Sequence, residues 1–233
     1  MNGNRIIPED LEAKSAREVL KWAQEEFGDK VALASSFGAE DVVLIDMLVK
    51  VNPQARIFTL DTGRLPQETY DLMDKVREKY KINLEVYYPD TRAVEEMVSR
   101  HGFNLFYKSV ELRKLCCKVR KVVPLGRALQ DLDAWICGLR REQAVTRTEV
   151  KKAEIDHAHN AIIKINPLSD WSEKEVWDYI KENDVPYNAL HDKGYPSIGC
   201  APCTRAVKPG EDVRAGRWWW EPPEKKECGL HSK

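Results

Sequence analysis

The chain has 233 residues, 42% of them hydrophobic, which is enough to bury a substantial core in one large domain or in a domain with an appendage. Its formal net charge is -1, yet Lys and Arg gather in three stretches, RKLCCKVRK, GLRREQAVTR and RAGRWWW. This pattern favours a local anionic ligand and argues against a nucleic-acid-binding protein. The chain has no apolar run near the roughly 18 residues of a membrane helix and no apolar signal core at its start, so we expect a cytoplasmic protein without membrane contact.

Short apolar runs rich in β-branched and aromatic residues predict strands. They cover residues 31–36, 56–62, 84–90 and 134–140. Segments with helical periodicity alternate with these runs. They cover residues 40–50, 66–80, 91–100 and 118–132, with Pro66 near a helix start and Thr91 as an N-cap. Strands that alternate with helices predict an α/β fold, in which a mostly parallel sheet has helices on both faces and binds ligands at the carboxyl ends of its strands.

Polar loops at the ends of three strands carry the predicted binding site. SSFGAED, at 35–41, offers hydroxyls and a helix N-terminus to a phosphate oxygen, although an N-capped turn explains it about equally well. LDTGR, at 60–64, is expected to bring its Asp and Thr near a ribose or base. GLRREQAVTR, at 138–147, brings three arginines, whose guanidinium groups match phosphate or sulfate. The predicted nucleotide-binding residues are Ser35, Ser36, Phe37, Gly38, Asp61, Thr62, Gly63, Arg64, Arg140, Arg141 and Arg147.

The six cysteines are expected to be metal ligands or catalysts rather than disulfide partners, because we expect a reducing compartment. The pair Cys116–Cys117 and the C-A-P-C motif of Cys200 and Cys203 supply four thiolates, which could hold zinc or a [4Fe–4S] cluster. Spacing alone does not choose between these metals, and a redox dithiol plus two buried thiols is the simpler alternative. Cys137 lies inside an apolar strand and is expected to be a core residue.

Near the end of the chain, the segment ECGLHSK contains Cys228 and His231. Taken alone, Cys228 is most simply an accidental surface cysteine. From about Pro196 the periodicity gives way to Gly, Pro, Cys, Arg and Trp. We therefore divide the chain into a nucleotide-binding α/β domain at 1–195, which includes the first cysteine pair, and a loop-rich C-terminal appendage at 196–233, which carries C-A-P-C and the tail.

Taken together, the motifs resemble one known family along nearly the whole chain. SSFGAED, LDTGRLPQETY, the cysteine pair with C-A-P-C, GLRREQAVTR, GRWWWE and ECGLH are similar to the motifs of assimilatory adenylyl-sulfate (APS) reductases, which belong to the phosphoadenylyl-sulfate (PAPS) reductase family. The resemblance implies a fold like that of the adenine-nucleotide α-hydrolases. It also implies reduction of APS to sulfite and AMP in sulfate assimilation towards cysteine.

The resemblance implies a role for each matching residue. It makes Cys116, Cys117, Cys200 and Cys203 the ligands of a [4Fe–4S] cluster and Cys228 the nucleophile that attacks the sulfate sulfur. It places around the phosphosulfate Lys121, Arg214, Arg217 and His231. The sulfur is shielded by negative oxygens, so an attacking thiolate needs such cations and an in-line approach. A cysteine on a hinged tail could form an S-sulfocysteine and then meet reduced thioredoxin or a glutaredoxin-like donor.

Three alternatives stay open at this point. An ATP pyrophosphatase of related fold is expected to have a glycine-rich SGGxDS-like loop, from which SSFGAED departs. A PAPS-specific reductase is expected to lack the four cluster cysteines, although Arg140 or Arg141 could accept a 3′-phosphate and allow dual use of APS and PAPS. A zinc-stabilised nucleotide-binding regulator is the third alternative. A homo-oligomer is compatible with the sequence.

The run of three tryptophans at 218–220 has two interpretations. Large aromatic rings can pack the C-terminal segment against the domain, or one of them can stack on adenine. We expect the packing role.

Overall fold

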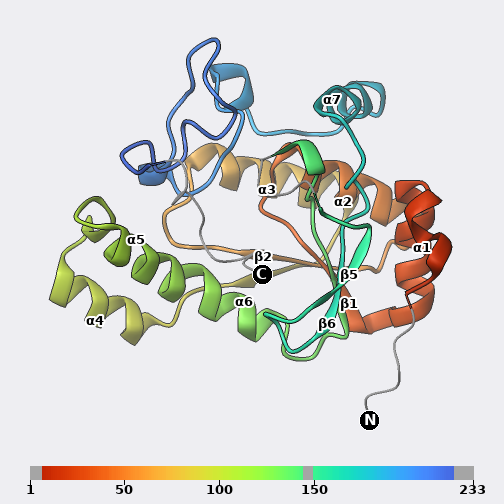
Figure 1. Cartoon of the computed structure of the whole chain (residues 1–233), viewed down its shortest axis with the longest axis horizontal. Helices are drawn as coiled ribbons and strands as arrows, with labels where there is room; N and C mark the ends of the chain where they lie inside the picture. The colour runs from red at the N-terminus through yellow and green to blue at the C-terminus, as the bar shows by residue number, and fades with distance from the viewer. Residues whose placement is uncertain (1–6, 144–148, 223–233) are drawn as a thin grey trace.

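A computed structural model of the protein describes residues 7–143 and 149–222. These residues form a layered α/β structure, with a six-stranded sheet in the order β3-β2-β1-β4-β6-β5 between two groups of helices (Figure 1). Neighbouring strands are parallel except for the hairpin of β5 and β6. The strands are β1 (Val31–Ala34), β2 (Arg56–Leu60), β3 (Leu84–Tyr87), β4 (Ala134–Ile136), β5 (Ala153–Asp156) and β6 (Ile162–Ile165).

The predicted α/β class with a mostly parallel sheet and helices on both faces is confirmed. From β1 the chain runs outward to β2 and β3 and then returns to the other side of β1 as β4. The strand order therefore reverses between β1 and β4, which is where open α/β sheets bind their ligands. The hairpin of β5 and β6 was not predicted, because no helix separates these two strands and the strand–helix alternation that predicts the other strands is absent there.

The helices agree with the predicted segments at 40–50, 66–80 and 91–100, but the segment at 118–132 differs. It consists of a π-helical stretch, Lys118–Val122, that continues into a short α-helix. The N-cap of the third helix is Asp90 and not Thr91, because the Asp90 carboxylate accepts the N–H of Ala93 at 2.9 Å. The α-helices are α1 (Ala16–Phe27), α2 (Ala39–Val51), α3 (Gln67–Tyr80), α4 (Thr91–His101), α5 (Val110–Cys117), α6 (Val123–Ala128) and α7 (Glu173–Glu182).

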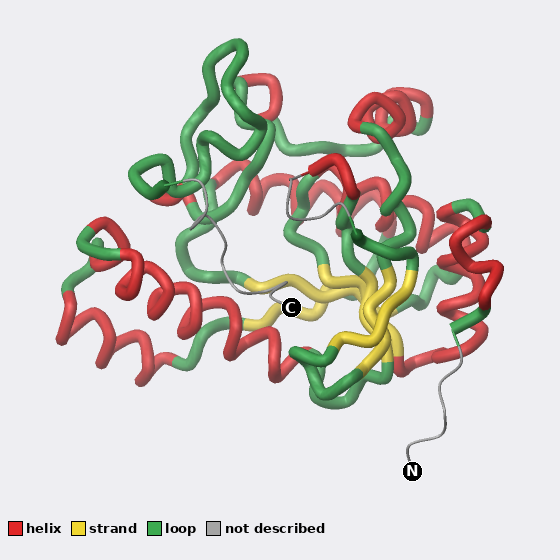
Figure 2. The backbone as a smooth tube through the Cα atoms, in the orientation of Figure 1, coloured by secondary structure: helices red, strands yellow, loops and turns green. Residues whose placement is uncertain are grey.

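Strand alternation divides the core between the two faces of the sheet. Figure 2 shows the strands with helices on both sides of them. Leu33 pairs in register with Ile57 and Ile136, and all three are buried in the cluster that contains residues of α1, α2, α3 and α7. Phe58 and Trp135 belong to the cluster on the other face, which contains residues of α6. Both faces are therefore apolar, as expected for parallel strands buried on both sides. No helix within the two described ranges is long and apolar enough to cross a bilayer.

The C-terminal segment at 196–222 contains one short 3₁₀ turn, Ala201–Cys203, and one isolated bridge, between Thr204 and Arg217, in its described residues. It packs closely against α5. Cys203 and Trp218 share an apolar cluster with Cys116 and Cys117 from the end of that helix. The division at residue 196 stays a prediction.

Candidate active site

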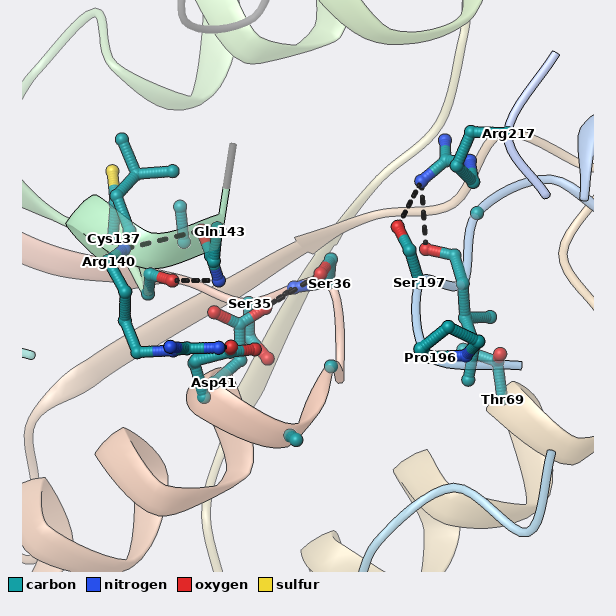
Figure 3. A pocket seen from close by; sticks show the side chains of 18 of the residues that line it. Ser35, Ser36, Asp41, Thr69, Cys137, Arg140, Gln143, Pro196, Ser197 and Arg217 are labelled. Atoms are coloured by element: carbon teal, nitrogen blue, oxygen red, sulfur yellow. Dashed lines mark hydrogen bonds and ion pairs between the residues drawn. The ribbon is translucent and has the colours of Figure 1, made fainter. Parts of the chain in front are cut away.

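A cavity of about 260 Å³ opens at the carboxyl ends of β1, β2 and β4. Figure 3 shows Ser35 and Arg140 on one side of it and Ser197 and Arg217 on the other. The floor is apolar. It is lined by Phe58, Leu60, Leu125, Trp135 and Leu139. An apolar floor with a few convergent polar groups is typical of a small-molecule site.

The SSFGAED loop is held in shape by one of its own acids. Ser36 donates both its backbone N–H and its hydroxyl to Oδ2 of Asp41, at 2.6 and 2.7 Å (Figure 3). Burial raises the pKa of Asp41 to about 6, although these hydrogen bonds act to lower it. The hydroxyl of Ser35 accepts the N–H of Phe37 at 3.1 Å. Ser35, Ser36 and Gly38 line the cavity, whereas Phe37 is buried in the core.

The end of β4 fits tightly against this loop. A Cβ atom on Gly138 would lie 2.4 Å from Oδ1 of Asp41, so the approach requires glycine. Two residues further on, Nε of Arg140 donates to Oε1 of Glu40 at 2.8 Å, and the Arg140 side chain is only 7% exposed. Gln143 donates to the Gly138 carbonyl at 3.1 Å and closes the turn. Arg140 therefore lines the cavity with its charge neutralised by Glu40.

The LDTGR loop joins the cavity to the cysteines. Asp61 is buried and accepts the hydroxyl of Tyr70 at 2.9 Å, so it supports the loop from inside. Thr62 lines the cavity, and its Oγ1 lies 3.2 Å from Sγ of Cys200. Arg120 donates to the Thr62 carbonyl at 2.7 Å. The loop thus contacts the C-A-P-C motif, a contact that the sequence did not indicate.

All four cysteines predicted as metal ligands line one small hollow of about 20 Å³ beside the cavity. We call it the cysteine hollow. The end of α5 contributes one pair and the 3₁₀ turn at 201–203 the other. Within the described chain, no three His, Cys, Asp or Glu side chains are grouped so that they could hold a single metal ion. The hollow is lined by Arg64, Phe106, Arg113, Cys116, Cys117, Arg120, Lys121, Cys200, Pro202, Cys203, Arg217 and Trp218.

The chemistry of the cysteine hollow is that of buried thiols among cations. Burial raises the pKa of the Cys203 thiol to about 12, the charges of Cys200 and Cys117 raise it as well, and Lys121 and Arg217 oppose the shift. A thiol with this pKa stays protonated at neutral pH, whereas a bound metal would hold it as a thiolate. The arginine and lysine side chains around them suit a group with net negative charge.

The three described cations that were predicted around the phosphosulfate come together. Lys121, Arg214 and Arg217 all line the cavity, and Lys121 and Arg217 line the cysteine hollow as well. Lys121 projects from the π-helical stretch, a distortion often found at functional sites. Arg217 donates from Nη1 to the Ser197 hydroxyl and to the Ile198 carbonyl, both at 3.3 Å (Figure 3).

Other predicted residues lie elsewhere. Arg141 does not line the cavity, because its Nε donates to the Val150 carbonyl at 2.8 Å and its Nη2 to Glu12 at 2.9 Å. Arg64 lies over the Phe106 ring in the cysteine hollow, 5.2 Å from its centre. Gly63 takes a left-handed φ of 67° in the turn before Arg64. The remaining predicted residues, Arg147, Cys228 and His231, lie outside the described residues.

The sequence did not point to several residues that line the cavity. Phe58 and Trp135 have the pattern of ordinary strand core, so only the sheet position shows that they form a floor. His191 lines the cavity 5.1 Å from the Trp177 ring, and its buried Nε2 has no hydrogen-bond partner among the described residues. Burial lowers the pKa of His191. A lone histidine at the start of a short 3₁₀ turn gives no sequence signal.

The tryptophan run is used mainly for packing. Trp218 is 1% exposed and lies at the border of the cavity and the cysteine hollow. Trp220 packs on Tyr107 with ring centres 4.5 Å apart, and Trp219 is 39% exposed. Neither Trp219 nor Trp220 lines the cavity.

Comparison with solved structures first identifies the class of fold. A PAPS reductase from Candida auris, in complex with phosphate, has a TM-score of 0.72 at 31% sequence identity, over 88% of this chain and 100% of that one. Yeast FAD synthetase has a TM-score of 0.57 at 12% identity, over 87% of this chain and 70% of that one, which shows the fold alone. The fold is that of the adenine-nucleotide α-hydrolase-like proteins.

Sequence comparison then identifies the family. The phosphoadenosine phosphosulfate reductase domain matches residues 30–206. An adenosine 5'-phosphosulfate reductase from Burkholderia cepacia is 56% identical over 203 residues, which is 87% of this chain and 81% of that protein. The chain belongs to the phosphoadenosine phosphosulfate reductase family.

Proposed function

We propose that this chain reduces adenylyl sulfate to sulfite and AMP in sulfate assimilation. The observation that carries the proposal is the wall between the two sites, because Lys121, Arg217 and Trp218 line both the cavity and the cysteine hollow. A nucleotide in the cavity can therefore present its anionic end to cations that also face four cysteines. The name of the relative from Burkholderia cepacia supports the same substrate.

The cavity offers separate places to the two ends of APS. The base would lie on the apolar floor near Phe58 and Trp135, since a flat ring gains most from burial there. The phosphosulfate would lie near Lys121, Arg214 and Arg217, which replace the hydration of its oxygens.

PAPS is the second candidate substrate, because the structural relative from Candida auris is a PAPS reductase. A 3′-phosphate needs an additional cation. Arg140 is paired with Glu40, and Arg141 is paired with Glu12 outside the cavity. These pairs favour APS, since neither arginine offers an uncompensated charge to a 3′-phosphate.

The proposed reaction has three displacements, and Cys228 is the nucleophile of the first. Its thiolate attacks the sulfate sulfur, an S–S bond forms, the S–O bond to the phosphate breaks, and AMP leaves with the electron pair. A thiol of reduced thioredoxin or a glutaredoxin-like donor then attacks the sulfur of Cys228, and sulfite leaves with the electron pair. The second donor thiol closes a disulfide and releases Cys228. In the first step, Lys121, Arg214 and Arg217 would stabilise charge on the sulfate oxygens, and we place His231 beside the substrate.

The cysteine hollow fits a [4Fe–4S] cluster. Cys116, Cys117, Cys200 and Cys203 would hold it, and a cubane spaces its thiolates more widely than a single tetrahedral zinc ion does. Trp218 Nε1 and Arg120 Nε are buried without a hydrogen-bond partner in the described chain, so they can donate to bound sulfur. When bound, the cluster would supply a fixed charge beside Lys121, while the dithiol donor supplies both electrons. We place the reaction in the cytoplasm, where thiols are kept reduced.

A mass measurement tests the mechanism. Protein incubated with APS in the absence of a dithiol should gain about 80 Da, the mass of SO₃, on the peptide that contains Cys228. Reduced thioredoxin should remove that mass and release sulfite. Cys228→Ser should bind AMP normally but gain no mass, whereas the control Cys137→Ser should gain it like the wild type. Normal turnover by Cys228→Ser would show that the mechanism is wrong, and comparing kcat/KM for APS and PAPS separates the two substrates.

A further inference from the structure

A fully buried ion pair lies beside the cysteine hollow. Arg113 donates from Nε to Oε1 of Glu221 at 3.0 Å and from Nη2 to Oε2 at 2.6 Å, which is the two-bond fork of an arginine and a carboxylate. The two side chains are 1% and 2% exposed, whereas those of the similar pair Arg56–Glu85 are 24% and 28% exposed. Burying both charges carries a desolvation penalty, so this pair is weak evidence for a stabilising role alone.

The pair fastens two segments that are distant in sequence. Arg113 lies one helical turn before Cys117 on α5. Burial acts to lower the pKa of Arg113, but Glu221 and Cys117 raise it above its ordinary value. Glu221 ends the RWWWE stretch, and its N–H donates to the Trp218 carbonyl at 2.8 Å. The ion pair therefore connects the helix of the first cysteine pair to the stretch that carries Arg217 and Trp218.

Trp218 links this ion pair to the cavity. The guanidinium carbons of Arg113 and Arg217 lie 4.8 and 4.7 Å from the centre of its ring. Trp218 has a φ of 40°, in the left-handed region that bulky residues rarely adopt, so its surroundings must hold it there. Arg217 is equally confined, because a Cβ atom on Gly199 would lie 2.3 Å from its Nη2.

We propose that Arg113 and Glu221 are positioning residues of the anion site. The pair holds Trp218 in its strained conformation, and Trp218 holds the Arg217 guanidinium beside Ser197 at the cavity wall. Arg113 and Glu221 do not themselves line the cavity. They act through Trp218 and Arg217 rather than by touching a substrate. The inference rests on the proposed function only for the identity of the anion.

Glu221→Gln tests the pair, because the amide keeps the shape of the side chain and removes its charge. The dissociation constant for APS should rise roughly tenfold, while that for AMP, which lacks the sulfate, should stay within about twofold. Calorimetry on the iron-loaded protein measures both constants, with Cys228→Ser in every sample so that APS is not consumed. Hydrogen exchange of the peptide covering 214–222 should become roughly tenfold faster, because the Trp218 N–H bond to the Cys203 carbonyl is released. Iron content should not change.

Two further variants make the test specific. Glu85→Gln removes the same kind of fork, with bonds of 2.8 and 3.1 Å to Arg56, and should alter neither APS affinity nor exchange at 214–222. Arg113→Lys keeps the charge but loses the fork, so it should change both measurements in the same direction as Glu221→Gln and by less.

The outcomes separate this proposal from the proposed function. An equal loss of APS and AMP affinity in Glu221→Gln, or unchanged exchange in both Glu221→Gln and Arg113→Lys, would overturn the positioning role. Cys228→Ser protein with an intact Arg113–Glu221 pair that binds APS no more tightly than AMP would instead contradict the proposed function, and the exchange measurement would still decide whether the pair holds Trp218.

Discussion

The cavity and the cysteine hollow share a wall, yet they are built differently. The cavity forms where β1, β2 and β4 end. Its SSFGAED loop satisfies its own hydrogen-bond donors, because Ser36 donates to Asp41 within the loop. The cysteine hollow is assembled from α5, the turn at 201–203 and the RWWW stretch, and it gathers thiols and cations.

This difference shows which part of the site comes from the fold and which part depends on particular residues of this chain. The fold recurs at 12% identity in yeast FAD synthetase, so the frame around the cavity depends on strand order more than on particular side chains. The cysteine hollow depends on individual residues brought together over long sequence distances. Changes in the two regions should therefore have different consequences.

The largest expected effect is in the cysteine hollow. Cys203→Ser should lose iron, sulfide and turnover together, because a hydroxyl is a poor ligand for a soft metal site. AMP should still bind, since Cys203 does not line the cavity. Iron and sulfide analysis beside calorimetry measures these properties, with Cys137→Ser as the control for iron content. Full iron content with normal turnover would contradict the assignment of Cys203 as a cluster ligand.

Substitutions in the shared wall should have the next largest effect. Lys121→Ala and Arg217→Ala should each cost about 2–4 kcal/mol of transition-state stabilisation, the scale for one preorganised charge. Steady-state kcat/KM for APS gives this value, and AMP affinity should fall less. Lys75→Ala, on the exposed side of α3, is the control. Unchanged kinetics in both wall variants would place the sulfate elsewhere.

Asp41 connects the cavity loop to the pH dependence of stability. Its pKa is about 6 in the folded protein against an ordinary value of 3.8, so the folded state binds more protons than the unfolded state between these pH values. The contribution of Asp41 to the free energy of unfolding should fall by up to about 3 kcal/mol as pH rises from about 4 to 6, and it should stay at the lower value above pH 6. Urea unfolding at several pH values measures the slope. In Asp41→Asn the free energy of unfolding should depend less on pH. The same pH dependence in this variant and in the wild type would contradict the raised pKa of Asp41.

The smallest expected effect is the change in the free energy of unfolding caused by Trp219→Ala, and the neighbouring Trp218 provides the contrast. Trp219 is 39% exposed, so Trp219→Ala should change the free energy of unfolding by less than about 0.5 kcal/mol. Trp218 is 1% exposed, and Trp218→Ala should cost about 3 kcal/mol or more. Denaturant unfolding of both variants compares them. Similar losses would mean that the exposed ring also contributes to packing.

Much of the fold could be predicted because α2, α3 and α4 repeat apolar residues with a helical period and are separated by apolar strands. The hairpin of β5 and β6 could not, because its two strands follow one another without a helix between them and so lack the strand–helix alternation that marks the others. The cavity floor could not be predicted either, because the sequence pattern indicates that Trp135 is buried but not that it lines a cavity.

The sequence by itself determined the α/β order and the residue types able to do the chemistry, because periodicity and thiol or guanidinium chemistry are local properties. Only the tertiary structure decided which charged groups come together at the site. Arg140 and Arg141 are paired with Glu40 and Glu12, while Lys121 and Arg217 meet at one wall. Such pairing depends on distance and desolvation in three dimensions, and residues about a hundred positions apart carry no sequence pattern that encodes either.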